Sequence, residues 1–138
     1  MISNQLLRTL SKTAPVPGRR YHSGIPVLDR MLGDGLQSGQ SIEWAGSYSC
    51  GKTGVLREVV RDARARGIAV AWVDTAHELI ATDWLDELPG RFWVLRPPGQ
   101  DDALFCVEAV LRAQSFGVVV LDSAPGLTPN RVVRLQRF

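Results

Sequence analysis

The feature that most constrains this chain is a glycine-rich octapeptide between a short apolar run and an amphipathic segment. Residues 46–53 read GSYSCGKT and fill every fixed position of the pattern G-x-x-x-x-G-K-[ST]. Residues 41–45 predict a strand, and residues 52–66 predict a helix that turns its valine, leucine and alanine side chains inward. A strand, a glycine-rich turn and a helix in this order are typical of an α/β fold that binds phosphate at the turn.

The pattern has a chemical reason at each fixed position. Small residues let successive backbone N–H groups turn toward an anionic phosphate, and the start of the helix adds its positive end. Lys52 is expected to reach the β- and γ-phosphates of a nucleotide, and Thr53 to offer its hydroxyl to Mg²⁺. The alternative is a chance glycine-rich turn. We predict that ATP and Mg²⁺ bind here, with the nucleotide held by Gly46, Ser47, Tyr48, Ser49, Cys50, Gly51, Lys52 and Thr53.

A second candidate ligand ends an apolar run. The sequence GVVVLD at 117–122 predicts a buried strand that delivers Asp122 to the carboxyl edge of a sheet, where α/β proteins bind their ligands. Beside a phosphate loop, such a carboxylate helps to hold Mg²⁺ directly or through water. The alternative is a strand that merely ends in Asp. The complete loop favours the metal role, so the predicted magnesium ligands are Thr53 and Asp122.

Strands and helices alternate along the rest of the chain. Strands are predicted at 68–74, 91–95 and 117–122, and helices at 77–88, 101–115 and from Thr128 onward. This alternation predicts an α/β fold with a parallel sheet flanked by helices. The tryptophans on strands, Trp44, Trp72 and Trp93, are expected in the core. Trp84 is expected to pack on its own fold, although it and Tyr48 could stack on a nucleotide base.

The N-terminal residues follow a different pattern. Leucine and isoleucine recur at helical spacing, which predicts a helix over 2–11, and two prolines and a glycine predict a linker over 13–20. The predicted organisation is an N-terminal helix at 1–12, a linker at 13–20 and a core at 21–138. The helix could dock on its own core or on a partner.

Composition excludes several classes of protein. A chain of 138 residues allows one domain. Sixteen Lys and Arg against fourteen Asp and Glu give a net charge of +2, too mild to indicate nucleic-acid binding by charge alone. The two cysteines provide no disulfide framework. Because no apolar run approaches the ~18 residues that a membrane span requires, we expect a cytoplasmic protein with no membrane partner.

The loop, Asp122 and several flanking segments together resemble the RecA-type recombinase ATPase core, which is a P-loop fold. The likeness runs from residue 21 to residue 129. Its further segments are SGIPVLD at 23–29, LGDGLQSG at 32–39, VDTAHEL at 73–79, RPPGQDDAL at 96–104 and LDSAPGLTP at 121–129. In character the chain is similar to the ImuA-type (SulA-like) RecA homologues that accompany error-prone translesion polymerases.

The resemblance implies an ATP-binding protein that acts through protein contacts in DNA repair or in the damage-induced mutagenesis of the SOS response. Its implied partner is RecA or a translesion polymerase complex. Self-association and DNA binding stay open. Arg131, Arg134 and Arg137 recur every third residue and could contact phosphates, but a solvated helix face explains the same spacing.

The chain departs from the family pattern at the catalytic glutamate. Counted from Asp74, the glutamate that orients the attacking water falls on Ala76, which cannot polarise a water molecule. Glu78 follows two residues later, and on a helix it would lie about 200° around the axis from Ala76. We therefore expect weak or no ATP hydrolysis. The alternatives are an active DNA-dependent ATPase completed by Glu78 or by a neighbouring subunit, a P-loop kinase, and an interaction module whose phosphate loop is vestigial.

A second departure concerns the sheet. The family places a later strand between the strand that precedes the phosphate loop and the strand that ends at Asp122. This sequence ends at Phe138, before any such strand. We expect a core truncated at its C-terminal side, with an unpaired strand edge. The alternatives are that another chain supplies the strand, or that the sheet closes differently.

Overall fold

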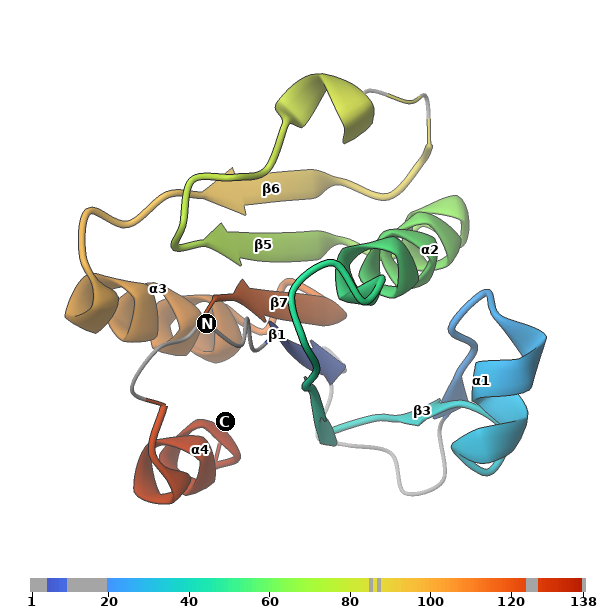
Figure 1. Cartoon of the computed structure of the whole chain (residues 1–138), viewed down its shortest axis with the longest axis horizontal. Coiled ribbons are helices and arrows are strands. Elements are labelled where there is room, and N and C mark those ends of the chain that lie inside the picture. The colour runs from blue at the N-terminus through green and yellow to red at the C-terminus, as the bar shows by residue number, and fades with distance from the viewer. Residues whose placement is uncertain (1–4, 10–19, 85, 87, 124–126, 138) are drawn as a thin grey trace.

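The fold is known from a computed structural model, which describes residues 5–9, 20–84, 86, 88–123 and 127–137. Its centre is a five-stranded sheet of order β4-β1-β7-β5-β6. These strands are β4 (Ser41–Trp44), β1 (Gln5–Thr9), β7 (Val118–Asp122), β5 (Val70–Asp74) and β6 (Phe92–Leu95). In Figure 1, β5, β6 and β7 point the same way. β5 pairs in parallel with both β6 and β7.

Helices cover both faces of the sheet, because alternate residues of its buried strands point to opposite sides. Val70 and Trp72 of β5 join the core formed with α2 (Lys52–Ala65), whereas Ala71 and Val73 join the core formed with α3 (Gln100–Ala113) and α4 (Pro129–Leu135). Figure 1 shows α3 and α4 on one side and α2 on the other. The predicted α/β class is confirmed.

Most predicted elements are confirmed with small shifts of their ends. The helix predicted over 52–66 is α2, the helix predicted over 101–115 is α3, and the helix predicted after Thr128 is α4. Thr128 caps α4 as its pattern indicates, since its side chain accepts a hydrogen bond from the Arg131 backbone N–H. Trp72 and Trp84 are buried, but Trp93 is 52% exposed, so its placement in the core was wrong.

The prediction of an N-terminal helix over 2–11 was wrong. Residues 5–9 form β1, which pairs antiparallel with β4 on one side and with β7 on the other. A short apolar segment fits either a helix or a strand, and pairing with two neighbouring strands decides between them. The linker predicted over residues 13–20 lies outside the described residues, except for Arg20, which belongs to β2 (Arg20–Tyr21).

β1 also changes the expected sheet. The sheet is mixed rather than parallel, since β1 runs against both of its neighbours. It lies between the strand that precedes the phosphate loop and the strand that ends at Asp122. The expected unpaired edge between those two strands was therefore wrong, and the structure follows the alternative in which the sheet closes differently.

The helix predicted over 77–88 is also absent from the described residues of that segment. Only η1 (Ala81–Trp84), a short 3-10 helix, forms there. His77 has a positive φ of 56°, which a right-handed helix excludes. The backbone N–H groups of Glu78 and Leu79 bond to the Asp74 carboxylate instead of to a preceding turn. The Asp74 side chain, at the end of β5, thus takes the backbone hydrogen bonds that a helix would need.

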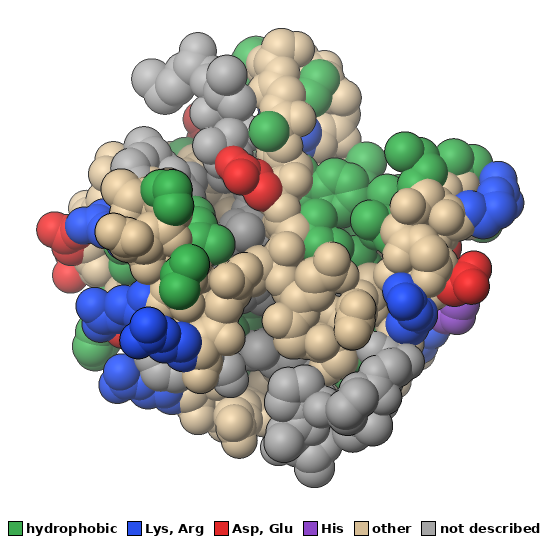
Figure 2. All heavy atoms as spheres, turned by 90° about the horizontal axis from the view of Figure 1, so that it is seen from below, with side chains coloured by type: hydrophobic (Ala, Val, Ile, Leu, Met, Phe, Trp, Pro, Cys, Tyr) green, Lys and Arg blue, Asp and Glu red, His purple; other side chains and the backbone are tan. Residues whose placement is uncertain are grey.

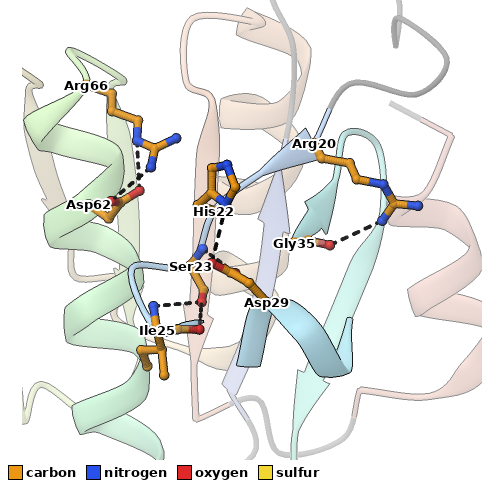
Figure 3. A network of polar contacts seen from close by, with 8 residues as sticks. All are labelled: Arg20, His22, Ser23, Ile25, Asp29, Gly35, Asp62 and Arg66. Carbon is orange, nitrogen blue, oxygen red and sulfur yellow. Dashed lines mark hydrogen bonds and ion pairs between the residues drawn. The ribbon is translucent and has the colours of Figure 1, made fainter. Parts of the chain in front are cut away.

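The segment before the phosphate loop forms three small elements that the pattern did not predict: β2, α1 (Pro26–Met31) and β3 (Leu36–Gln37). Figure 3 shows their polar contacts beside α2. Asp29 accepts a hydrogen bond from the Ser23 backbone N–H at 2.7 Å. Gly35 has a φ of +113°, and a Cβ there would lie 2.5 Å from the Tyr21 carbonyl oxygen, so the β2–β3 pair requires glycine at this position.

Candidate phosphate-binding site

The glycine-rich loop connects β4 to α2 and turns sharply before the helix begins. Gly51 caps α2 with a φ of +89°, a conformation that costs glycine little, and Ser49 also has a positive φ, of 57°. Two left-handed residues within three positions reverse the chain. The loop therefore curls over the N-terminal end of α2, as its pattern predicts.

The Lys52 side chain folds back and bonds to the backbone at the start of its own loop. Its Nζ donates hydrogen bonds to the carbonyl oxygens of Gly46 at 2.9 Å and Ser47 at 2.7 Å, and lies 3.4 Å from the Cys50 Sγ. A Cβ on Gly46 would lie 2.7 Å from that sulfur, so a larger residue at position 46 would force the Cys50 side chain to move. The ammonium group is thus held against the start of the loop.

The electrostatics at this end of α2 favour an anion. The first N–H groups of a helix lack partners within the helix, and their dipoles sum to a partial positive charge. α2 has 14 residues, and its first turn carries Lys52 but no acidic side chain. Backbone N–H groups and one ammonium are the donors that a phosphate accepts. The residues present therefore fit the phosphate chain of a nucleotide.

Asp122 lies at the same edge of the sheet as the loop. β4 and β7 are both antiparallel to β1, so they point in the same direction, and Gln5 of β1 pairs with Trp44 on one side and Asp122 on the other. Adjacent strands lie about 4.8 Å apart, which places the backbones of Trp44 and Asp122 roughly 10 Å from one another. The structure thus brings the loop with Thr53 and the Asp122 carboxylate to one edge, with the width of β1 between their strands.

The loop after β5, residues 75–79, lies at this edge as well and contains Ala76 and Glu78. Both side chains are exposed. Because the segment is not helical, the expected rotation of Glu78 away from Ala76 does not apply. The conformation is set by Asp74, whose side chain is fully buried and accepts the N–H groups of Glu78 at 3.1 Å and Leu79 at 3.2 Å.

Two further residues hold the loop of residues 75–79, and the sequence did not single them out. Arg96, just after β6, donates from Nε to the Asp74 carboxylate at 3.1 Å and from Nη2 to the Leu79 carbonyl at 2.5 Å. Thr75 donates its hydroxyl proton to the Asp122 carbonyl at 2.6 Å and also contacts the Ser123 carbonyl. No local pattern reveals these pairs, since their partners are 17 or more residues away.

The arginines of α4 do not stand free above the surface. Arg131 pairs with Asp101 at 3.4 Å and Arg134 with Glu108 at 2.7 Å, so both partners come from α3. Figure 2 shows Lys and Arg side chains gathered on the side where α4 lies. Exposed ion pairs of this kind contribute little to stability, and they occupy two of the three arginines proposed as phosphate contacts.

Comparison with known proteins identifies the family. The RecA N-terminal domain family matches residues 7–135. The chain belongs to this family. The match includes most of β1, the whole glycine-rich loop, the loop of residues 75–79 and Asp122, so the candidate site lies inside the matched region.

Curated relatives agree with this assignment. The RecA protein of Treponema pallidum (strain Nichols) is 33% identical over 116 residues, which cover 81% of this chain and 28% of the relative. The RecA protein of Dichelobacter nodosus is 34% identical over 111 residues, covering 78% and 32%. That of Nostoc sp. (strain PCC 7120) is 30% identical over 140 residues, covering 94% and 39%. The chain thus spans about a third of the length of these relatives, and no solved structure matches it.

Within the described residues, no helix is both long and apolar enough to cross a membrane. No group of three or more His, Cys, Asp and Glu side chains in the same part of the chain could hold a metal ion.

Proposed function

We propose that this RecA-family domain binds ATP with Mg²⁺ at residues 46–53 and hydrolyses it weakly or not at all. Bound ATP would order the loops that a protein partner recognises. The observation that carries the proposal is the closed loop at the start of α2, with Lys52 Nζ held by the Gly46 and Ser47 carbonyl oxygens. These contacts keep one cation beside a row of backbone N–H groups, where a phosphate chain would lie.

Each proposed ligand has the chemistry that its role needs. Lys52 would exchange its loop carbonyls for the β- and γ-phosphates, and Thr53 and Asp122 would offer oxygen to magnesium, which prefers oxygen ligands. When bound, the magnesium ion would neutralise phosphate charge. Gly46 and Gly51 would keep the loop close to the phosphates, since neither has a Cβ.

Weak hydrolysis is supported by the residue at position 76. Ala76 occupies the position of the family's water-orienting glutamate, and its methyl group cannot accept a proton from water. Without a group that positions the attacking water, a nucleotide site loses much of its catalytic advantage. Bound ATP would then serve to order the loops around the site rather than to be turned over.

The biological role that we propose is in damage-induced translesion mutagenesis, as in ImuA-type RecA homologues. RecA itself or an error-prone polymerase complex would be the protein partner. The absent glutamate supports a role that depends on protein contacts rather than on ATP turnover. Large apolar side chains that stay exposed, such as Met31 at 79% and Phe105 at 71%, are available for protein contacts. Figure 2 shows hydrophobic side chains on the α1 side of one face.

The chain contains a reporter for nucleotide binding and an internal reference. Cys50 is an exposed thiol inside the loop, whereas Cys106 of α3 is half-buried. Burial, and to a smaller extent the Asp102 carboxylate, raises the pKa of the Cys106 thiol, so less of it is ionised at neutral pH and it reacts more slowly. Alkylation at the two positions can be followed separately by mass spectrometry.

We expect Mg-ATP to slow the alkylation of Cys50 and to leave the rate at Cys106 unchanged. The Lys52→Ala variant should lose this protection. Raising the pH should speed the alkylation of Cys106 as its half-buried thiol ionises. Equal rates at Cys50 with and without Mg-ATP, in wild-type protein, would contradict the proposed nucleotide site.

An active DNA-dependent ATPase is the second candidate, favoured by one observation. The segment after Asp74 is a loop rather than a helix, so the exposed Glu78 is not fixed opposite Ala76. ATP turnover that rises with single-stranded DNA and falls in Glu78→Gln would establish this activity. No turnover in either protein, with or without DNA, would leave the weak-hydrolysis proposal standing.

A further inference from the structure

The ends of β5, β6 and β7 are joined at one edge by the loop of residues 75–79. Asp74 and Arg96 fix the loop at Leu79, and the His77 ring Nε2 lies 3.1 Å from the Pro97 carbonyl oxygen. At its first residue, the Thr75 hydroxyl reaches the end of β7. Figure 1 shows the three strands ending on this side.

Thr75 touches β7 at the residue proposed for magnesium. Its Oγ1 lies 2.6 Å from the carbonyl oxygen of Asp122 and also contacts that of Ser123, which has a positive φ of 53°. The Ser123 hydroxyl in turn lies 3.5 Å from Asp122 Oδ1. Two successive carbonyls at the turn out of β7 therefore meet one hydroxyl, and the turn sets the direction in which the Asp122 side chain leaves the sheet.

Little water-accessible space lies beside this contact. A pocket that is partly open to solvent, with a volume of about 10 Å³, is lined by Thr75, Leu121, Ser123, Leu127 and residues of α3. This volume is close to the least that holds one water molecule. A valine at position 75 would place a methyl group where the hydroxyl now meets the two carbonyl oxygens and would push the strand ends apart.

We infer that Thr75 is a positioning residue for the proposed magnesium ligand Asp122, and that its hydroxyl sets the magnesium requirement of nucleotide binding. This inference rests on the proposed function, since it needs a nucleotide site. It assigns no catalytic contact to Thr75. Because Thr75 acts on the carbonyl oxygens at the strand end, removing its hydroxyl should weaken the magnesium-dependent part of binding and spare the rest.

The test measures the affinity for a fluorescent ATP analogue as Mg²⁺ is titrated, with EDTA as the metal-free reference. Thr75→Val should raise the Mg²⁺ concentration for half-maximal effect by about fivefold, which corresponds to loss of roughly one hydrogen bond. The metal-free affinity should stay within about twofold. Thr75→Ser, which keeps the hydroxyl, should need the same Mg²⁺ concentration for half-maximal effect as wild-type protein. Asp122→Asn should raise that concentration at least as much as Thr75→Val does.

The outcomes separate the inference from the proposed function. An unchanged Mg²⁺ requirement in Thr75→Val, beside a raised one in Asp122→Asn, would overturn the inference and leave the site intact. Wild-type protein that binds no nucleotide would overturn both. The midpoint of the Mg²⁺ titration does not depend on the fraction of folded protein. If Thr75→Val does not fold, Thr75→Ala replaces it, because alanine places no methyl group against the two carbonyl oxygens.

Discussion

Two loops leave the same edge of the sheet and are held in opposite ways. The loop of residues 46–53 is closed by its own atoms, since Lys52 bonds to the carbonyls of Gly46 and Ser47. The loop of residues 75–79 is held from outside, by Arg96 after β6 and by the end of β7, as well as by Asp74. One conformation is local, and the other depends on the assembled sheet.

The difference indicates which loop contributes more to the stability of the fold and which contributes more to nucleotide binding. A loop closed by a half-buried lysine can open toward a ligand at small cost, because the groups that separate can bond to water instead. A loop anchored on a buried carboxylate cannot rearrange without exposing that charge or leaving it unpaired. Substitutions in residues 46–53 should therefore change nucleotide affinity more than stability, and substitutions around Asp74 should do the reverse.

The largest effect on stability is expected from Asp74→Ala. The change leaves Arg96 and the N–H groups of Glu78 and Leu79 without their acceptor, and Arg96 is 44% exposed, so water compensates in part. We expect a loss of about 3 kcal/mol in the free energy of unfolding, measured with urea. Asp62→Ala, which breaks the more exposed Arg66 pair of α2, should cost less than about 1 kcal/mol. Equal losses would mean that the buried Asp74 carboxylate anchors its loop no more firmly than a partly exposed ion pair would.

A smaller loss is expected from Arg96→Gln. The variant loses the charge beside Asp74 and the contact of Nη2 with the Leu79 carbonyl, but the two backbone N–H groups still satisfy the carboxylate. Because Arg96 is partly exposed, we expect a loss of about 1–2 kcal/mol in the same measurement. A loss as large as that of Asp74→Ala would mean that the arginine, rather than the carboxylate, organises the loop.

A loss of stability no larger than that of Arg96→Gln is expected in the other loop, from Gly51→Ala. Its φ of +89° penalises any residue with a Cβ by about 1–2 kcal/mol, and the larger consequence should be weaker nucleotide binding. Gly54→Ala is the matched control, since its Cβ would meet nothing within 4 Å and alanine favours a helix by about 1 kcal/mol. The unfolding temperature should thus be lower than that of wild-type protein for Gly51→Ala and higher for Gly54→Ala. Destabilisation by both would contradict the described start of α2.

The same contrast explains what could be predicted from the sequence. The pattern at 46–53 and the apolar runs of β5 and β7 are local, and they predicted the loop, its flanking elements and Asp122 at the sheet edge. The helix predicted over 77–88 failed because Asp74 and Arg96, 22 residues apart, capture the backbone that a helix would use.

The N-terminal prediction failed for a related reason. Residues 5–9 form a strand because β4 and β7 offer backbone partners on both sides, and both partners lie more than 30 residues away in the sequence. Trp93 was expected in the core because it lies on a strand, but β6 is an edge strand and leaves half of that ring exposed. Sequence patterns predicted elements made by their own residues and missed those decided by distant partners.

The most direct test of the account is calorimetric titration of Mg-ATP into this domain and into Lys52→Ala. The substitution removes the ammonium group that bonds to the Gly46 and Ser47 carbonyls and leaves the loop of residues 75–79 untouched. We predict saturable binding heat for the wild-type protein and none for the variant, with nearly equal unfolding temperatures. Binding that is equally strong in both proteins, or absent from the wild-type domain, would contradict a nucleotide site at residues 46–53.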